Sequence, residues 1–483
     1  MRYLLSTLVF ISAFSAPVLA NDYFNNILSI IEPPHSHTSI IATNLISGET
    51  IFQKNADTLL LPASTMKLLT AVGATSVLGK EFRYQTQFFS HYPIANGVID
   101  GDLYIKFSGD PTLKLSDFRE VFKQLSDQGL HKISGNVYLV GETNEQLQAP
   151  GWVWDDLGIC YAAPVSSFII NRNCIHAELK AKLASSKSQL SMPSYLPVSI
   201  ENTAVFDKTE NNPFCELSLT RLASNQFNLS GCFPGSKSLK LAIAITDPSL
   251  FAQQSLAQLF KSNQIKLKGS VYLNGNLPKY RSLIASHESA PLKDIVKTML
   301  VKSDNLIADS LLKELGRTIY GAPGSFSKGA LALKEVLVRD GVALDYAQII
   351  DGSGLSRYNL LSARQLSQVL NLIYKDTRFD YIIDSLPISG ISGTLKYKTS
   401  FNKPPLKQHI LAKTGSMQGV DNLAGFIRAK AIDDTLFVIM ENGQSPIEKK
   451  EQLAPFSALF LQSMMDKPLM PSVDTSGSIS SSK

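Results

Sequence analysis

Hydrophobic and polar residues alternate in several short segments near both ends of the chain, which is the pattern of strands buried on one face. The first segment, from Thr38 to Asn55, is divided at Ser47 and Gly48 and therefore predicts a β-hairpin. Three further strands are predicted near the other end, at 409–417, 422–430 and 434–443, ahead of an apolar helix at 449–465. We expect these five strands to pair in one antiparallel sheet flanked by helices.

The middle of the chain contains further short strand and helix patterns around a more polar stretch. Predicted strands at 101–109 and 133–141 enclose a helix at 115–129, and a strand followed by a helix occurs at 241–265. The stretch before this last pair is β-like and rich in serine and asparagine, so we expect an insertion within an insertion. The predicted parts are a signal peptide at 1–20, a sheet domain at 21–84 and 281–466, an inserted domain at 85–175 and 237–280, a β-rich inserted domain at 176–236, and a disordered tail at 467–483.

The first 20 residues have the composition of a secretory signal peptide. Arg2 precedes an apolar stretch, and Val18, Leu19 and Ala20 have the small-residue spacing of a cleavage site. Serine and threonine residues interrupt this stretch, which is already short for a membrane-spanning helix, so a membrane anchor is the weaker interpretation. No later segment is long and apolar enough to cross a bilayer, and we expect a soluble protein outside the cytoplasm.

The composition is that of an ordinary globular chain, with 44% hydrophobic and 18% charged residues, and the length favours more than one domain. The net charge of +5 is mildly basic. No block of lysine and arginine with interleaved aromatic residues occurs, so we expect no nucleic acid partner. The charge supports at most a weak, peripheral association with an anionic wall or membrane surface.

Four cysteines, Cys160, Cys174, Cys215 and Cys232, lie in the middle third of the chain. In an oxidising compartment, an even and local set of cysteines indicates disulfides. We favour Cys160 with Cys174 and Cys215 with Cys232, although the sequence permits three connectivities. A zinc site is disfavoured, because the chain has no C-x-x-C and no histidine pair near these cysteines.

The stretch 61–70, LPASTMKLLT, places Ser64 and Lys67 three residues apart at the start of a strongly apolar predicted helix. Residues i and i+3 lie on one helix face, so the lysine amine can reach the serine hydroxyl. Burial and the positive end of the helix dipole both favour the neutral amine, which is the form that accepts a proton. Ser-x-x-Lys alone is a weak signal, because the chain contains four other matches, among them Ser310 with Lys313.

Two further motifs follow in order. A Ser-Asp-Asn motif at 303–305 opens another predicted helix, where a hydroxyl that can relay a proton lies beside an amide that can hold a substrate carbonyl. The only Lys-Thr-Gly of the chain, at 413–415, occurs on a predicted strand. A strand edge can pair with an extended peptide, its glycine allows close approach, and the lysine and hydroxyl groups can bind a carboxylate.

The three motifs, in this order, resemble the signature of penicillin-binding proteins and serine β-lactamases. The interval of 236 positions from Lys67 to Ser303 (303 − 67) leaves room for the nested insertions. The chain therefore resembles the class C low-molecular-mass penicillin-binding proteins, which are D-alanyl-D-alanine carboxypeptidase/endopeptidases of the penicillin-binding protein 4 type. The likeness extends to 101–113, 149–174, 351–357, 386–396 and 413–427, and so covers nearly the whole mature chain.

This resemblance implies an α/β (α+β) penicillin-binding or transpeptidase-like domain with a five-stranded antiparallel sheet flanked by helices, plus two nested inserted domains. It also implies a periplasmic enzyme of the Gram-negative type without cofactor or metal. The implied partners are peptidoglycan pentapeptides, cross-linked stem peptides and β-lactam antibiotics. The implied catalytic residues are Ser64, Lys67, Ser303 and Asn305, and the implied substrate-binding residues are Lys413, Thr414, Gly415, Ser416, Asp156, Tyr161, Arg357 and Gln418.

In the resemblance each of these residues has a role. Ser64 would be acylated by the carbonyl of the penultimate D-alanine, with Lys67 as general base, and water would then hydrolyse the acyl-enzyme. The oxyanion would lie between the backbone N–H groups of Ser64 and Ser416, each donor being worth ~3 kcal/mol. Lys413 and Thr414 would hold the terminal carboxylate of the peptide.

The family also lines a pocket for the diaminopimelate side chain of the stem peptide. By position, its members are Asp156, Tyr161, Arg357 and Gln418. A carboxylate for an ammonium group and a guanidinium for a carboxylate suit a zwitterionic side-chain end. The alternatives are a turn cap at Asp156, core packing at Tyr161 and a structural ion pair at Arg357.

Four other functions are less consistent with the sequence. A class A β-lactamase needs a Glu-x-x-x-Asn between the first two motifs, and none occurs there, so we expect slow deacylation. A non-catalytic wall-binding or antibiotic-sensing protein would not need all three motifs. A metalloenzyme is disfavoured because the seven histidines are scattered without H-E-x-x-H. A Ser-His-Asp hydrolase is disfavoured because no G-x-S-x-G surrounds Ser64.

Overall fold

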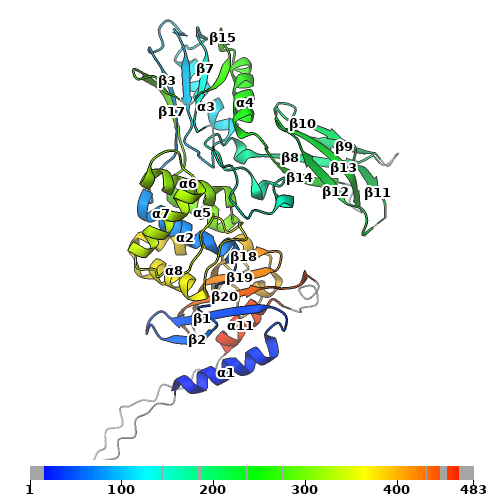
Figure 1. Ribbon diagram of the computed structural model, residues 1–483, viewed down its shortest axis with the longest axis vertical. Coiled ribbons are helices and arrows are strands. Elements are labelled where there is room, and N and C mark those ends of the chain that lie inside the picture. The colour runs from blue at the N-terminus through cyan, green and yellow to red at the C-terminus, as the bar shows by residue number, and fades with distance from the viewer. Residues whose placement is uncertain are drawn as a thin grey trace, which may run out of the picture.

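The computed structural model describes residues 16–466, except 143–144, 183–186, 210–211, 235–237, 275, 431 and 447–453. At its centre is an antiparallel sheet in which strands from the two ends of the chain lie side by side, coloured blue and orange in Figure 1. The strand order is β18-β19-β20-β1-β2. The strands are β1 (His37–Asn44), β2 (Thr50–Lys54), β18 (Ile410–Met417), β19 (Val420–Ala429) and β20 (Ile432–Asn442).

Helices cover both faces of this sheet because its strands carry apolar residues on both sides. Along β20, Leu436, Val438 and Met440 pack into the larger helical core, whereas Phe437 and Ile439 pack toward the opposite face. The larger layer contains α2 (Met66–Leu78), α5 (Leu292–Lys302), α6 (Asn305–Tyr320), α7 (Phe326–Arg339), α8 (Ala363–Lys375) and α9 (Asp380–Ile383). The opposite face is covered by α1 (Ala16–Ile31) and α11 (Phe456–Asp466).

A second group of elements is inserted between α2 and α5. Its main sheet is mixed, in the order β16-β7-β5-β3-β17, and β5, β7 and β16 run parallel. Two helices, α3 (Leu115–Asp127) and α4 (Pro248–Ser262), contribute to the core of this group. The strands of the main sheet are β3 (Gln85–Ser90), β5 (Leu103–Lys106), β7 (Val137–Val140), β16 (Val271–Asn274) and β17 (Ser282–Glu288). A second, three-stranded sheet consists of β15 (Lys266–Leu267), β6 (Lys132–Ile133) and β4 (Val98–Ile99), in that order.

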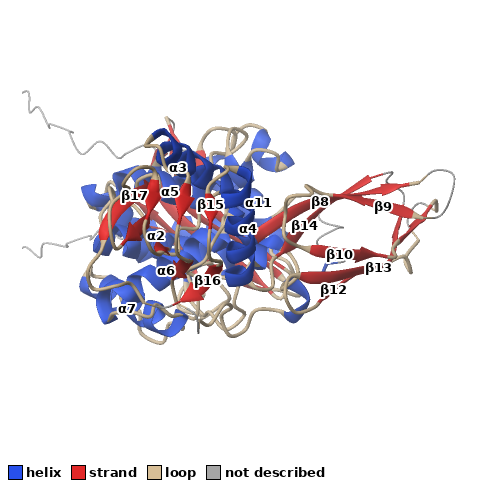
Figure 2. Ribbon diagram, turned by 90° about the horizontal axis from the view of Figure 1, so that it is seen from above, coloured by secondary structure: helices blue, strands red, loops and turns tan. Residues whose placement is uncertain are grey.

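A third group is β-rich and projects to one side of the molecule in Figure 2. A four-stranded sheet combines β10, β11, β12 and β13, and a three-stranded sheet has the order β14-β8-β9. The strands are β8 (Cys174–Ala181), β9 (Ser188–Ser191), β10 (Ser199–Asn202), β11 (Val205–Asp207), β12 (Leu217–Arg221), β13 (Gln226–Pro234) and β14 (Ser238–Ala244). Since β14 pairs with β8, this sheet lies on both sides of the predicted boundaries at 175 and 236.

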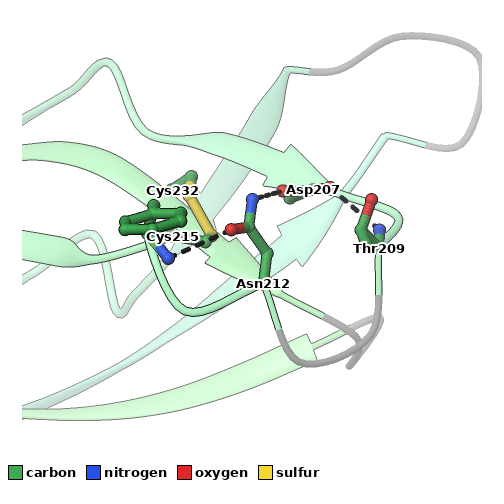
Figure 3. Close-up of a disulfide and its surroundings, with 6 residues drawn as sticks. Asp207, Thr209, Asn212, Cys215 and Cys232 are labelled. Atoms are coloured by element: carbon green, nitrogen blue, oxygen red, sulfur yellow. Dashed lines mark hydrogen bonds between the residues drawn. A yellow bond between two sulfur atoms is a disulfide. The ribbon is translucent and has the colours of Figure 1, made fainter.

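Both disulfides have the favoured connectivity, Cys160 with Cys174 and Cys215 with Cys232. Figure 3 shows the second one, which lies near Asp207. The Asp207 carboxylate accepts hydrogen bonds from the Asn212 side chain (2.7 Å) and from the Thr209 N–H (2.8 Å). Asp207 and the two sulfurs are close enough together for metal ligands. Because the sulfurs are bonded to each other, neither is a thiolate ligand.

The predicted five-stranded antiparallel sheet flanked by helices is confirmed. The exact domain boundaries stay predictions. The helix α1 begins inside the predicted signal peptide, whose first 15 residues lie outside the described residues, as does the predicted tail at 467–483. Within the described part of the chain, no helix has both the length and the apolar character needed to cross a membrane.

Candidate active site

The first two motifs meet at the side chain of Lys67. Ser64 lies in a short 3-10 turn, η1 (Ala63–Thr65), that leads into α2, and Lys67 follows in the first turn of that helix. The Lys67 Nζ lies 2.9 Å from Ser64 Oγ and donates to Asn305 Oδ1 at 2.7 Å. It also donates to the backbone oxygen of Ser353 at 2.6 Å. The amine is fully buried, whereas Ser64 is partly exposed.

These contacts suit a neutral amine that accepts a proton. Burial lowers the pKa of Lys67 to about 8, and the nearby carboxylates of Asp309, Asp351 and Asp304 oppose that shift. A neutral amine has two N–H groups and one lone pair. If the two carbonyl-type oxygens of Asn305 and Ser353 accept the two N–H groups, the lone pair is left to face the Ser64 hydroxyl. The geometry therefore supplies a serine with an adjacent general base.

A turn that the sequence interpretation did not assign to the site supplies one of these oxygens. Both Gly352 and Ser353 donate their N–H groups to Asp309 Oδ1, at 2.8 and 2.9 Å. Asp351 accepts the N–H groups of Gly354 and Ser356, at 2.8 and 2.6 Å. The pKa of the buried Asp309 is raised well above its usual value, chiefly by desolvation. Two buried carboxylates thus fix the backbone that holds Lys67.

Two glycines allow backbone segments to pass close to the turn that carries Ser64. A Cβ on Gly354 would lie 1.8 Å from the Ala63 backbone oxygen, and the φ of +79° at Gly354 also favours glycine. A Cβ on Gly415 would lie 2.7 Å from the Pro62 backbone oxygen. Ala63 itself has a φ of +46°, an uncommon conformation for a residue other than glycine. The residue before Ser64 is therefore held in a strained backbone conformation by close neighbours.

The third motif lies on β18 and faces the second one. Lys413 is fully buried, and its Nζ donates to Ser303 Oγ and to the Thr414 backbone oxygen, both at 2.8 Å. Burial lowers the pKa of Lys413 well below its usual value, and the charge of Lys67 acts in the same direction. The Thr414 hydroxyl lies 2.8 Å from that of Thr394. Ser416, farther along β18, is exposed.

The Ser-Asp-Asn motif lies between two helices and not simply at the start of one. Ser303 ends α5 with a φ of +55°, and Asp304 caps α6 by accepting the Ile307 N–H at 3.2 Å. Asp304 also forms an ion pair with Arg172. Asn305 begins α6 and donates through Nδ2 to the Tyr161 backbone oxygen at 2.9 Å. These contacts fix the Asn305 amide, so that its oxygen faces Lys67.

The four residues predicted for a side-chain pocket form two pairs. The Tyr161 hydroxyl donates to Asp156 Oδ1, and Tyr161 is 46% exposed, so it is not a core residue. The Arg357 guanidinium donates to the Gln418 backbone oxygen at 3.4 Å through each terminal nitrogen. Among the described residues, no hydrogen bond joins one pair to the other. The Cys160–Cys174 disulfide lies next to Tyr161 and anchors the first pair.

Sequence reasoning thus named the residues of three distant segments that lie together here. It did not name Asp309, Asp351, the Ser353 carbonyl, Thr394 or Arg172. The stretch 351–357 was noted as part of the resemblance, but only Arg357 was given a role. These contacts depend on which backbone and side-chain atoms the fold brings together from distant segments, and residue types alone do not show this.

Residues 25–462 match the D-Ala-D-Ala carboxypeptidase 3 (S13) family. The chain is 33% identical over 448 residues to the D-alanyl-D-alanine carboxypeptidase DacB of Haemophilus influenzae, covering 92% of this chain and 93% of that protein. It is 26% identical over 429 residues to a D-alanyl-D-alanine carboxypeptidase of Actinomadura sp. (strain R39), covering 84% and 78%.

A solved structure shows the same fold. The crystal structure of penicillin-binding protein 4 from Haemophilus influenzae matches with a TM-score of 0.84 and 31% sequence identity, covering 92% of this chain and 98% of that one. A second structure of that protein, in complex with a β-lactam, matches with a TM-score of 0.81 and 30% identity, with the same coverage.

Proposed function

Because the chain belongs to the D-Ala-D-Ala carboxypeptidase 3 (S13) family, we propose that it is a serine D-Ala-D-Ala carboxypeptidase that also cleaves D-alanyl-diaminopimelate cross-links in peptidoglycan. The observation that carries the proposal is the position of Lys67, whose Nζ lies within 2.9 Å of Ser64 Oγ and is held by Asn305 and Ser353. The likeness to penicillin-binding protein 4 over 92% of the chain supports the substrate class.

The first step forms the acyl-enzyme. The Ser64 oxygen attacks the carbonyl carbon of the penultimate D-alanine while its proton passes to Lys67 Nζ. The N–H groups of Ser64 and Ser416 stabilise the negative charge on the carbonyl oxygen. The C–N bond then breaks, and the proton returns to the leaving amine from Lys67 directly or through Ser303, which accepts a hydrogen bond from Lys413.

The second step releases the shortened peptide. A water molecule replaces the leaving amine, gives a proton to Lys67 and attacks the acyl carbon, and the Ser64 oxygen leaves with a proton. Carboxypeptidase and endopeptidase reactions share both steps. They differ in the leaving amine, which is free D-alanine in one case and a diaminopimelate side chain of a second stem in the other.

Substrate recognition follows from the charges around these groups. The Lys413 side chain, together with the Thr414 hydroxyl, binds the carboxylate that follows the scissile bond, and the negative charge of this carboxylate favours the protonated form of the lysine. The pairs Asp156/Tyr161 and Arg357/Gln418 hold the zwitterionic end of the diaminopimelate side chain on the acyl side.

β-Lactams use the same acylation step. Their ring carbonyl acylates Ser64. The ring-opened product stays attached because its leaving nitrogen remains part of the adduct and does not make room for the water of the second step, and because the chain between Lys67 and Ser303 has no Glu-x-x-x-Asn as a second means of activating water. The predicted signal peptide and the two disulfides support an oxidising compartment, which we take to be the periplasm.

The deciding experiment compares the purified protein with its Ser64→Ala variant on pentapeptide stems and on cross-linked muropeptides, read by mass spectrometry. We expect the wild type to release D-alanine and to convert cross-linked dimers to monomers, and the variant to do neither. Penicillin labelling without any released D-alanine would favour an antibiotic sensor. Rapid, repeated hydrolysis of nitrocefin would favour a β-lactamase, and a fully active variant would exclude Ser64 from the mechanism.

A further inference from the structure

A cavity of about 300 Å³, with both apolar and charged side chains in its wall, lies against α6, on a different face of this helix from the one that carries Asn305 and Asp309. One wall is formed where the parallel strands β5 and β7 end, at Lys106 and Val140, and the facing wall is α6. Figure 1 shows α6 where the helical layer meets the inserted strands. The carboxyl ends of parallel strands and the junctions between domains are common places for ligand sites.

Two buried hydroxyls in the wall of this cavity lack a hydrogen-bond partner among the described residues. Ser310 is 5% exposed, and its Oγ has no hydrogen-bond partner among the described residues. The Ser108 hydroxyl, also on the cavity wall, is in the same state. A buried polar group without a partner is destabilising by about 1–3 kcal/mol. Both oxygens are shielded from solvent, so a rotation of each side chain about χ1 is needed to turn its hydroxyl toward a ligand in the cavity. Ser310 belongs to one of the four additional Ser-x-x-Lys matches, which the proposed mechanism does not use.

Most charges on the cavity wall are neutralised by ion pairs within the wall. Lys313 Nζ lies 3.3 Å from the Glu145 carboxylate, and the Arg317 guanidinium forms an ion pair with Glu314 at 2.6 Å. Two charged groups remain without an ion pair among the described residues, Lys106 and Glu142. The Glu142 carboxylate accepts only the Gly324 N–H, at 3.1 Å, among the bonds observed. The groups available to a ligand are therefore one cation and one anion, and two hydroxyls that become available when their side chains rotate.

A metal ion does not fit this arrangement. In the part of the chain that the structure describes, no three acidic side chains of this cavity bring their ligand atoms within 4.8 Å of one another. A ligand with its own separated positive and negative groups matches the two unpaired charges. The volume corresponds to a molecule of amino-acid size together with several waters, since one water occupies ~30 Å³ of liquid.

We propose that this cavity is a binding site for a zwitterionic amino acid. Its ammonium group binds Glu142 and the Ser310 hydroxyl, and its carboxylate binds Lys106 and the Ser108 hydroxyl. Two sources have this chemistry, the free D-alanine that the proposed reaction releases and the diaminopimelate end of a stem peptide. That the ligand is D-alanine or diaminopimelate rests on the proposed function. That the ligand is a zwitterionic amino acid rests only on the cavity.

The helix α6 connects the two sites physically. Asp309 accepts the N–H groups of the turn that holds Lys67, and the next residue, Ser310, faces the cavity. A ligand that binds Ser310 therefore contacts the same helix that starts at Asn305. The site is placed to sense the amount of free amino acid around the enzyme.

The test is equilibrium binding to the mature chain that carries Ser64→Ala, measured by titration calorimetry. The probes are D-alanine, L-alanine and meso-diaminopimelate, with propionate and ethylamine as analogues that lack one charge. We expect saturable binding of at least one amino acid, and binding weaker by at least about tenfold for both analogues. Tighter binding of D-alanine identifies the product as the ligand, and tighter binding of diaminopimelate identifies the stem peptide.

Cavity variants locate the binding. Glu142→Gln and Lys106→Met each remove one charge and should weaken binding by at least about tenfold. The control variants Glu120→Gln and Lys123→Met remove the same charges from the exposed face of α3 and should leave binding unchanged. Thermal melting of each variant shows that it is folded. Absence of saturable binding, or binding that Glu142→Gln and Lys106→Met leave unchanged, would overturn the proposal.

The outcome is independent of the catalytic proposal. Binding that depends on Glu142, together with a wild-type protein that releases no D-alanine, would refute the proposed function and retain this site. Release of D-alanine by the wild type, without binding of any amino acid in the cavity, would support the proposed function and refute this site.

Discussion

At the scale of single residues, the site depends on keeping one lysine neutral and oriented. Lys67 is surrounded by acceptors on Asn305 and Ser353, and burial lowers its pKa to about 8. A lysine in water holds its proton up to a pH of roughly 10. The fold therefore moves the proton equilibrium of Lys67 into a range where a useful fraction of the amine is free at neutral pH.

The pH dependence of acylation follows from this shift. Because only neutral Lys67 accepts the Ser64 proton, the acylation rate should rise about tenfold per pH unit below pH 8 and level off above it. Stopped-flow acylation by a fluorescent penicillin, between about pH 6 and about pH 9, measures this profile. An acylation rate that stays constant over this pH range, in a protein that remains folded, would show that Lys67 is not the general base.

Asp309 is a positioning residue for Lys67, which it affects both through its charge and through the turn that it holds. Its charge raises the pKa of Lys67, and its Oδ1 accepts the N–H groups of Gly352 and Ser353. Asp309→Asn keeps an acceptor oxygen but removes the charge, so the pH profile of acylation should move to lower pH. Asp309→Ala removes the acceptor as well, and the plateau rate should fall by at least about tenfold.

The control for this pair is Asp345→Asn, an exposed carboxylate that should change neither the rate nor the profile. Loss of stability alone would lower the amount of active protein without moving the pH profile. An Asn variant whose profile coincides with that of the wild type would therefore show that Asp309 has only a structural role.

At the scale of elements, the segment from Cys160 to Cys174 positions the Ser-Asp-Asn motif. Its Tyr161 carbonyl accepts the Asn305 amide, and its Arg172 forms an ion pair with Asp304. The disulfide joins the two ends of this segment. A covalent link therefore fixes a loop on which the orientation of Asn305 depends.

Removing the two disulfides separately distinguishes this effect from general stabilisation. They have similar sequence separations, 14 and 17 residues, so each should contribute ~3 kcal/mol to the free energy of unfolding. The double variant Cys160→Ser, Cys174→Ser should also lower the penicillin acylation rate by about tenfold or more. The double variant Cys215→Ser, Cys232→Ser lies in the β-rich group and should acylate at the wild-type rate. Equal rates in the two variants would contradict a positioning role for the first disulfide.

At the scale of the whole molecule, the five-stranded sheet predicted from both chain ends is present. The alternation pattern predicted strands with one buried face, whereas β20 is buried on both faces, because helices cover both sides of the sheet. The nested insertions were inferred from a change in composition. The sequence did not predict that β14 pairs with β8, because tertiary contacts decide which strand is the partner of another. The same limit applies at the site. Motif spacing located Ser64 and Lys413, whereas Asp309 and the Ser353 carbonyl act through backbone geometry.

The dependence of the site on a sheet made from both chain ends makes a final prediction about stability. Phe460 on α11 is fully buried, and its ring centroid lies 5.6 Å from that of Phe24 on α1 and 5.8 Å from that of Phe52 on β2. Phe460→Ala should lower the free energy of unfolding by about 3–5 kcal/mol. Phe214, by contrast, is 90% exposed, and Phe214→Ala should change it by less than about 0.5 kcal/mol.

Urea unfolding followed in parallel by circular dichroism and by penicillin labelling tests whether this loss reaches the site. Strand β18, which carries Lys413, and strand β1, from the other end of the chain, belong to one sheet. Phe460→Ala, which weakens the packing of α11, should therefore move two midpoints to lower urea concentration by the same amount, that of penicillin labelling and that of unfolding of the sheet. A labelling midpoint that stays at the wild-type value in Phe460→Ala, while part of the circular dichroism signal is lost earlier, would show that the site is stable without its C-terminal helix.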